Sequence, residues 1–415
     1  MPNPYRSLFE ASGSIRFVLA GLIARMALPM TGIGIITLLS QLHGGFALAG
    51  AVSGTFVLAY ALISPQVSRL VDRHGQSRVI PSATLVCLLG VTILLASTWL
   101  QLPHWTLFIG ASLAGTMPSV SALVRARWTV AYRDQPRLQT AYSLETVLDE
   151  LTFVAGPPLS VGLSVAIFPQ AGLLLAAVLL AAGVAALIAQ RDTEPAATTS
   201  TMDTGKSTSA LRQPVVQLLA CLMLTMGIIV GTVDVASVAF AAEATEPAAA
   251  SLILSAYATG SCLAGLLFGV WKTRIPLARL LLLGGTATAV TTLPLWLADT
   301  IPHLAAAVFV AGLFFAPTMI VAMSLIERTV PAAQLTEGMT WLLAGLNVGV
   351  ATGAVASGQI VDQAGASAGF GVAVCGAALV FITAWLGCVY LHGKDRSELA
   401  QGSSAASSDQ EPECS

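Results

Sequence analysis

The chain has 415 residues, of which 55% are hydrophobic and only 10% are charged. Soluble domains carry about 25% charged residues, so this composition excludes a soluble enzyme and predicts an integral membrane protein. The formal net charge of -2 gives the chain no basic footprint for nucleic acid, which is therefore not an expected partner.

Long apolar runs extend along nearly the whole chain. A helix needs about 20 apolar residues to cross a bilayer, and the sequence divides into about twelve such runs. The expected spans are 15–40, 46–71, 79–99, 106–128, 142–167, 171–190, 215–240, 248–271, 278–298, 302–326, 337–361 and 367–392. The pattern predicts an all-α integral membrane fold with about twelve transmembrane helices in two six-helix, pseudo-symmetric bundles.

Polar segments mark the expected domain boundaries. Residues 191–214 are rich in Thr, Ser and Asp, as linkers are, and separate the first six runs from the last six. We therefore expect an N-terminal bundle at 1–190 and a C-terminal bundle at 215–392. The tail 393–415 is Ser-rich and acidic, which predicts a disordered cytoplasmic segment.

The basic residues predict the orientation of the chain, because Lys and Arg concentrate in cytoplasmic loops. With the N-terminus inside, all but one of the 19 basic residues fall on the cytoplasmic side, and the exception, Arg25, lies within the first span. The opposite loops hold Glu243, Glu246, Asp299 and Asp362. This pattern predicts a multi-pass protein of the cytoplasmic (inner) membrane with both termini in the cytoplasm.

Ionisable residues inside the membrane are costly and are candidates for function. Arg25 is expected near mid-membrane, where it must contact a carboxylate, a carbonyl or an anionic solute; a structural ion pair is the alternative. Asp234 lies in the seventh span. A carboxyl group in a low-dielectric environment can bind and release a proton near physiological pH. The alternatives are a residue of a water-filled outer mouth, or the partner of Arg25.

The fifth span begins with three acids, Glu145, Asp149 and Glu150, and no base accompanies them. Glu145 and Asp149 share one helix face because they are four residues apart. Their counter-charge must come from other segments, and the candidates are Arg73, Arg78, Arg125 and Arg127. This arrangement predicts a salt-bridge cluster that closes the cytoplasmic side, or proton binding by Asp149 or Glu150.

Two further patterns concern packing. Gly345, Gly349 and Gly353 recur at four-residue spacing in the eleventh span, which predicts a face that another helix approaches closely. Tryptophans near the ends of spans are expected to anchor the chain at the membrane interface. These are Trp99, Trp105, Trp128, Trp271 and Trp296.

The loop after the second span carries the most informative motif. Asp72-Arg73-x-Gly75, with Arg78 following, resembles the loop between helices two and three of the major facilitator superfamily, although Gln76 and Ser77 stand where that family has basic residues. Arg25-Met-Ala-Leu-Pro and Gly156-Pro157 are similar to segments of its bacterial small-molecule efflux members.

The resemblance implies a secondary transporter that works by alternating access. It assigns a gating loop to Asp72, Arg73, Gly75 and Arg78, and it places helices one, four, seven and ten around a central cavity. The implied cavity residues are Arg25, Met26, Met30, Thr31, Ser119, Ser121, Thr232, Thr318, Met319 and Met323. The candidates for proton coupling are Asp234, Asp149, Glu150 and Glu145.

The function expected from these features is proton-coupled export of a small amphipathic organic solute, with the bilayer and protons as partners and a monomer as the working unit. The alternatives are metabolite uptake by symport or facilitated diffusion on the same scaffold, or a membrane receptor that transports nothing. No catalytic motif, metal-ligand pair or phosphate loop occurs, so neither an enzyme nor a cofactor nor a metal site is expected.

Overall fold

The computed structural model describes residues 6–43, 45–132, 135, 137–195, 212–270, 275–330 and 335–408. Residues 196–211 of the expected linker and Trp271 lie outside the described residues, as do the side chains of Asp72 and Glu150. All regular secondary structure in the described part of the chain is helical. The all-α membrane fold expected from the sequence is thereby confirmed.

The first half of the chain forms one bundle. After a short 3-10 helix at Arg6–Glu10, its helices follow in sequence order. They are α1 (Ser14–Arg25), α2 (Ala27–His43), α3 (Phe46–His74), α4 (Gln76–Trp99), α5 (Trp105–Ala114), α6 (Val120–Ala131), α7 (Arg137–Ala166) and α8 (Ala171–Ile188).

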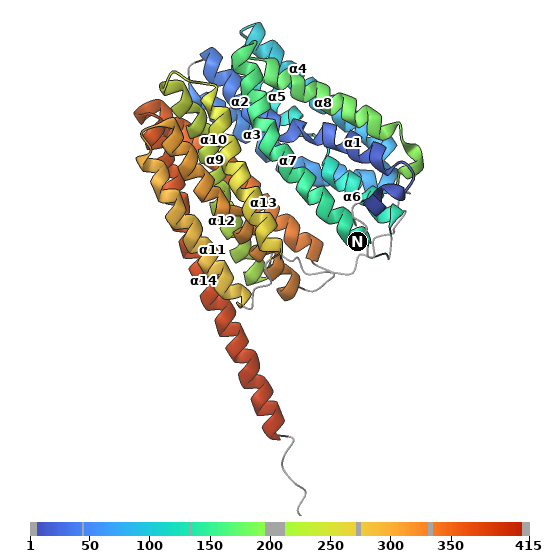
Figure 1. Ribbon diagram of the computed structural model, residues 1–415, viewed down its shortest axis with the longest axis vertical. Coiled ribbons are helices and arrows are strands. Elements are labelled where there is room, and N and C mark those ends of the chain that lie inside the picture. The colour runs from blue at the N-terminus through green and yellow to red at the C-terminus, as the bar shows by residue number, and fades with distance from the viewer. Residues whose placement is uncertain are drawn as a thin grey trace, which may run out of the picture.

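The second half forms the other bundle. Its helices are α9 (Pro214–Glu243), α10 (Ala249–Val270), α11 (Leu277–Thr292), α12 (Ile301–Thr329), α13 (Leu335–Ala364) and α14 (Ala366–Ser408), with a 3-10 turn at Leu293–Leu297 after α11. Figure 1 shows the blue-to-green helices of the first half on one side and the yellow-to-red helices of the second half on the other. Helix α14 continues to Ser408, past Gly393, where the sequence predicts the start of a disordered tail, and no proline interrupts it before Pro412.

Two expected spans are interrupted where a proline removes a backbone donor. Pro29 cannot donate to the carbonyl of Arg25, the last residue of α1, and Pro118 cannot donate to the carbonyl of Ala114, the last residue of α5. The first and fourth spans are therefore each built from two helical segments.

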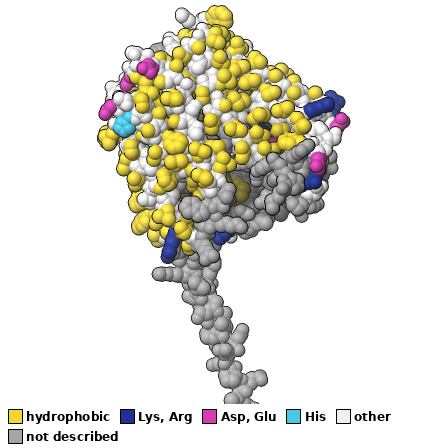
Figure 2. Space-filling view, viewed as in Figure 1, with side chains coloured by type: hydrophobic (Ala, Val, Ile, Leu, Met, Phe, Trp, Pro, Cys, Tyr) yellow, Lys and Arg dark blue, Asp and Glu magenta, His cyan; other side chains and the backbone are white. Residues whose placement is uncertain are grey.

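Ten segments in the described part of the chain are long and apolar enough to cross a membrane. The fourth and fifth spans of the twelve are not among them, since α5 and α6 are short and α7 carries the acids Glu145 and Asp149. Figure 2 shows an apolar surface over the visible face, with charged side chains gathered near its edges. This distribution fits a protein whose sides contact lipid.

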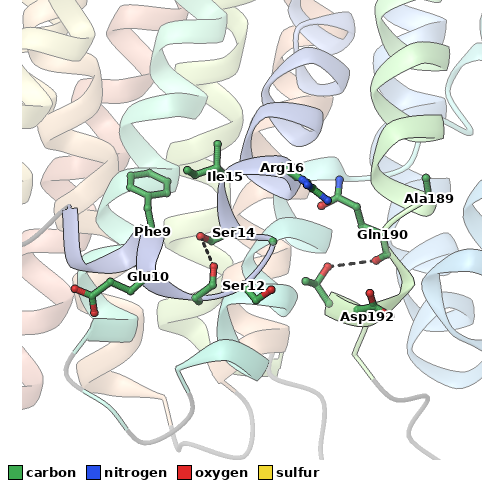
Figure 3. Close-up of a pocket in the computed structure, with 12 residues that line it drawn as sticks. Phe9, Glu10, Ser12, Ser14, Ile15, Arg16, Ala189, Gln190 and Asp192 are labelled. Atoms are coloured by element: carbon green, nitrogen blue, oxygen red, sulfur yellow. Dashed lines mark hydrogen bonds between the residues drawn. The ribbon is translucent and has the colours of Figure 1, made fainter.

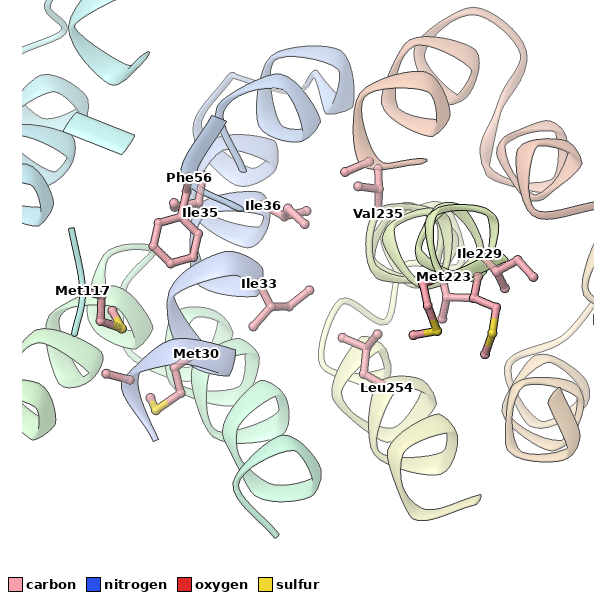
Figure 4. Close-up of a cluster of buried hydrophobic side chains, with 14 of the residues drawn as sticks. Met30, Ile33, Ile35, Ile36, Phe56, Met117, Met223, Ile229, Val235 and Leu254 are labelled. Atoms are coloured by element: carbon pink, nitrogen blue, oxygen red, sulfur yellow. The ribbon is translucent and has the colours of Figure 1, made fainter. Parts of the chain in front are cut away.

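Buried apolar side chains fill the interior of both bundles and belong to one cluster. Figure 4 shows Met30, Ile33 and Phe56 of the first bundle on one side, and Met223 and Ile229 of α9 on the other. All five side chains are buried. The bundles meet where α3 packs against α13 and α7 packs against α10.

The glycine face expected in the eleventh span is confirmed in α13. A Cβ added at Gly345, Gly349 or Gly353 would collide with the backbone carbonyl of Ala220, Leu224 or Ile228 of α9. Gly227 and Gly231 of α9 approach α13 equally closely. Helices α9 and α13 therefore pack backbone to backbone, as small residues allow in membranes.

Candidate functional site

A network of charged and polar side chains lies inside the first bundle, between α1, α6 and α7. Arg25 at the end of α1 forms salt bridges with Glu145 and with Asp149, and its Nη1 lies 2.9 Å from Asp149 Oδ1. Arg125 Nη2 of α6 lies 2.8 Å from Asp149 Oδ2. Two guanidinium groups thus neutralise two carboxylates.

Neutral donors complete the network. Trp128 Nε1 donates to Glu145 Oε1 at 2.8 Å, and the Ser121 hydroxyl donates to Asp149 Oδ1. The charged Arg25 also makes a contact within its own helix, since its Nε donates to the Gly21 carbonyl at 3.3 Å. We call Arg25, Ser121, Arg125, Trp128, Glu145 and Asp149 the α1/α6/α7 network.

Helical spacing explains how the network assembles. Glu145 and Asp149 are four residues apart on α7, and Ser121, Arg125 and Trp128 recur at four and three residues on α6, so each set lies along one helix face.

Solvent exposure divides the network into a buried part and an accessible part. The side chains of Glu145 and Arg25 are 0% and 3% exposed, whereas those of Asp149 and Arg125 are 22% and 36% exposed. Both oxygens of Glu145 are occupied by buried donors. Glu145 is therefore placed to hold α1, α6 and α7 together, and Asp149 is the acid of the pair that solvent or a solute can reach.

Of the two counter-charges of the α7 acids, Arg125 is among the four basic residues that the sequence suggests, whereas Arg25 is not. Arg25 and Arg125 take this role, whereas Arg73 and Arg78 are exposed. Arg127 is buried elsewhere and donates to Gln76 Oε1 at 2.9 Å, to the Gln190 and Leu187 carbonyls and to Thr193 Oγ1. It ties α6 to the start of α4 and to the end of α8.

Trp128 does not have the position expected of an interface anchor. Its side chain is fully buried, and it packs edge-on against Phe17 with ring centroids 4.8 Å apart. The interface assignment is wrong for this residue because Glu145 offers its indole N–H an acceptor inside the bundle. Trp99, Trp105 and Trp296 are exposed, as anchors are.

The loop between α3 and α4 turns at Gly75, whose φ of 90° lies where only glycine is unstrained. The backbone N–H of Ser77 donates to Glu194 Oε1 at 2.8 Å, so a carboxylate from the segment after α8 caps the start of α4. A Cβ at Gly75 would lie 3.1 Å from the same Glu194 oxygen. The proposed gating loop is thus held against its own bundle at this position.

Asp234 lies apart from the α1/α6/α7 network. It is half-buried on α9, and among the described residues the structure gives its carboxylate no hydrogen bond and no ion pair. Tyr257 of α10 is near enough to interact with it electrostatically. The alternative that Asp234 pairs with Arg25 is wrong, because α7 provides the partners of Arg25.

The remaining cavity candidates divide by burial. Thr31, Thr232 and Thr318 are buried, and each hydroxyl donates to a carbonyl of its own helix at 2.7 Å. Met30 is also buried. Four others are half-buried and remain candidates for contact with a solute: Met26, Ser119, Met319 and Met323.

A separate cavity of about 500 Å³ opens where the chain begins. It is lined by the segment from Phe9 to Arg16 and by Ala189, Gln190, Asp192 and Thr193 (Figure 3). None of the network residues and none of the cavity candidates line it. This cavity therefore gives no support to a solute site.

Taken together, two helical bundles that enclose charged side chains within apolar spans define a multi-pass membrane transporter. The chain belongs to the Major Facilitator Superfamily, whose family model matches residues 17–244 and again residues 219–408. The protein is accordingly a transporter of a small-molecule substrate rather than an enzyme.

Solved structures with the same fold agree. The crystal structure of the nucleoside transporter NupG is similar with a TM-score of 0.69 at 14% identity, covering 91% of this chain and 98% of that one. The in meso crystal structure of the POT family transporter PepTSo is similar with a TM-score of 0.70 at 12% identity, covering 92% and 98%. A comparison of the sequence with curated proteins gave no match. At these identities the likeness concerns the fold alone.

Proposed function

We propose that this protein exports a small amphipathic organic solute from the cytoplasm in exchange for protons. It acts by alternating access as a monomer in the cytoplasmic membrane, with both termini in the cytoplasm and 191–214 as the cytoplasmic linker between the two bundles. The orientation rests on the placement of the basic residues, which the sequence puts almost entirely on the side of the termini.

The observation that carries the proposal is the unpaired Asp234 carboxylate within α9. A charged carboxylate without a partner is costly inside a membrane, so Asp234 is stabilised when it binds a proton or another cation. Arg25 and Arg125 of the first bundle are engaged by Glu145 and Asp149. Asp234 is therefore our first candidate for the group that carries the proton.

Asp149 is the second candidate. It is partly exposed, and its two carboxylate oxygens contact Arg25, Arg125 and Ser121. Protonation would remove its charge and release Arg125, which is also partly exposed. A movement between α6 and α7 could in this way accompany proton binding. Glu150 remains a third candidate, and Glu145 is assigned a structural role.

The candidate contacts support the proposed nature of the solute. Met26, Met319 and Met323 present flexible apolar side chains, and Ser119 adds one hydroxyl. Thioether side chains adapt to ligands of varied shape. With few fixed charges beyond Asp149, Arg125 and Asp234, these contacts suit an amphipathic organic solute better than a sugar or a phosphate.

Metabolite uptake is the competing function. The fold is shared with the nucleoside transporter NupG, and the same scaffold supports export and import. What favours export here is the resemblance of Arg25-Met-Ala-Leu-Pro and Gly156-Pro157 to efflux members.

The test is a transport assay in inverted and right-side-out membrane vesicles, with and without a proton gradient. A panel of fluorescent amphipathic compounds of positive, negative and zero charge serves as probe. Export predicts accumulation in inverted vesicles that collapses when a protonophore is added. Accumulation in right-side-out vesicles alone would show uptake instead.

A further inference from the structure

Asp362 connects the two bundles at the membrane face opposite the chain termini, where Gly45 and Gly365 also lie. This exposed residue, near the end of α13, reaches the first turn of α3 in the other bundle. The backbone N–H of Phe46 donates to Asp362 Oδ1 at 2.7 Å, and that of Ala47 donates to Oδ2 at 2.8 Å. Each carboxylate oxygen thus accepts one hydrogen bond across the bundle interface.

These contacts replace a cap that α3 lacks. The first N–H groups of a helix have no partner within the helix, and they form the positive end of its dipole. The residue before α3 is Gly45, which has no side chain to cap them. Asp362 supplies both the acceptors and the negative charge, but only while the bundles are together at this face.

Close backbone packing continues from this cap toward the middle of the membrane. A Cβ added at Gly358 would collide with the Phe46 carbonyl, and one at Gly50 would collide with the Ala354 carbonyl. Deeper still, a Cβ at Gly54 would lie 3.1 Å from the Ala351 carbonyl. Helices α3 and α13 therefore meet in a seam of small residues, which we define as Gly50, Gly54, Ala351, Ala354 and Gly358.

We propose that Asp362 is a gating residue. It stabilises the closed conformation, in which α3 and α13 meet along the small-residue seam, over the open one, in which the bundles part at this face. The seam leaves no room for a solute, so a path through this face requires α3 and α13 to separate. Separation exposes the two N–H groups and removes their counter-charge. The inference rests on the proposed function only in requiring that the bundles alternate between two arrangements.

Glu243 provides a matched comparison at the same face. Its Oε1 accepts a hydrogen bond from the backbone N–H of Ala366 at 2.8 Å, and so caps α14 from α9. Helices α9 and α14 belong to one bundle and move together, so this cap is present in both arrangements. Loss of the Glu243 cap should lower stability without changing the balance between conformations, whereas loss of the Asp362 cap should change that balance.

The expected shift is about tenfold in the open-to-closed ratio, the size expected when a helix cap worth about 1.4 kcal/mol is lost from one conformation only.

The experiment measures the alkylation rate of a cysteine placed at Ala351, a seam residue that is 1% exposed, in a background without native cysteines. The protein is reconstituted in lipid nanodiscs and treated with a polar maleimide, and no transported solute is needed. Because the reagent reaches this position only when the seam opens, the rate follows the open population even where that population is small.

Asp362→Ala should raise the alkylation rate about tenfold. Asp362→Asn should raise it less, because asparagine retains one carbonyl acceptor. Glu243→Ala should leave the rate unchanged. An unchanged rate in Asp362→Ala would overturn the proposal. An equal rise in Glu243→Ala would also overturn it. The same holds if the protein that carries the Ala351 cysteine, with Asp362 and Glu243 intact, reacts as fast as one with an exposed cysteine at Ala248. A negative transport assay would count against the proposed function and not against the gate, since the alkylation rate is read without transport.

Discussion

Replacement of Glu145 by glutamine tests the α1/α6/α7 network most sharply. The substitution Glu145→Gln keeps the shape of the side chain and one acceptor for Trp128, but removes a charge from a position that is 0% exposed. Two guanidinium groups then face the single carboxylate of Asp149. Removal of one partner from a buried ion pair costs about 3–5 kcal/mol. Because Asp149 still contacts Arg25, we expect the lower end, about 3 kcal/mol.

The assay is unfolding of the purified protein in detergent, followed by intrinsic tryptophan fluorescence. Glu10→Gln is the matched control, because Glu10 and Arg137 form a pair 3.2 Å apart in which both side chains are exposed. Exposed pairs contribute about 0–1 kcal/mol, so the control should stay near the parent.

A double variant separates charge from packing. Arg25→Met combined with Glu145→Gln restores equal numbers of positive and negative charges, and should recover part of the lost stability. If Glu145→Gln proves as stable as Glu10→Gln, the buried pair does not hold the three helices together and the reasoning is refuted.

Three further predictions concern packing, the turn and the topology. Gly349→Ala should reduce the yield of folded protein, because the added Cβ collides with the Leu224 carbonyl. Gly162→Ala is the control and should not reduce the yield, because a Cβ there meets nothing within 4 Å; size-exclusion profiles compare the two variants. Gly75→Val should cost about 1–3 kcal/mol in thermal unfolding, because valine is strained at a φ of 90°; an unchanged midpoint would argue against the turn. Cysteines at Ser207 and Ala244 should react with an impermeant reagent from the cytoplasm and from the outside respectively, and labelling from one side only would refute the topology.

Hydrophobic run length predicts most of the fold, because the bilayer imposes a nearly constant helix length. The two interrupted spans were also within reach of the sequence. Pro29 and Pro118 each lack the N–H that would bond to the carbonyl four residues earlier. The helices accordingly end at Arg25 and at Ala114, the residues that bear these carbonyls. The proline rule alone is not sufficient, since Pro65 and Pro317 lie inside uninterrupted helices.

The sequence predicted that charged residues form the site, but not which arginines pair with which acids. Charge balance within a membrane requires arginines near Glu145 and Asp149, and the sequence offers several. Which ones meet the acids depends on how α1, α6 and α7 face one another, and that depends on the break after Arg25. The burial of Trp128 had a signal in its spacing, since it lies three residues from Arg125 on the face of α6 that meets α7. The bond between Asp362 and α3 joins residues more than 300 positions apart and has no local signature.

The central claim is that Asp234 couples solute movement to protons, and exchange in proteoliposomes tests it most directly. The probe is a fluorescent compound that the vesicle assay identifies as transported. Asp234→Asn should abolish accumulation driven by a proton gradient and retain exchange of solute across the membrane, since exchange needs no net proton movement. Asp149→Asn and Glu150→Gln are measured alongside. If Asp234→Asn still accumulates the compound against its gradient, the claim for Asp234 is wrong. If all three variants do so, coupling through these acids is wrong, and coupling to another ion such as sodium is the better explanation.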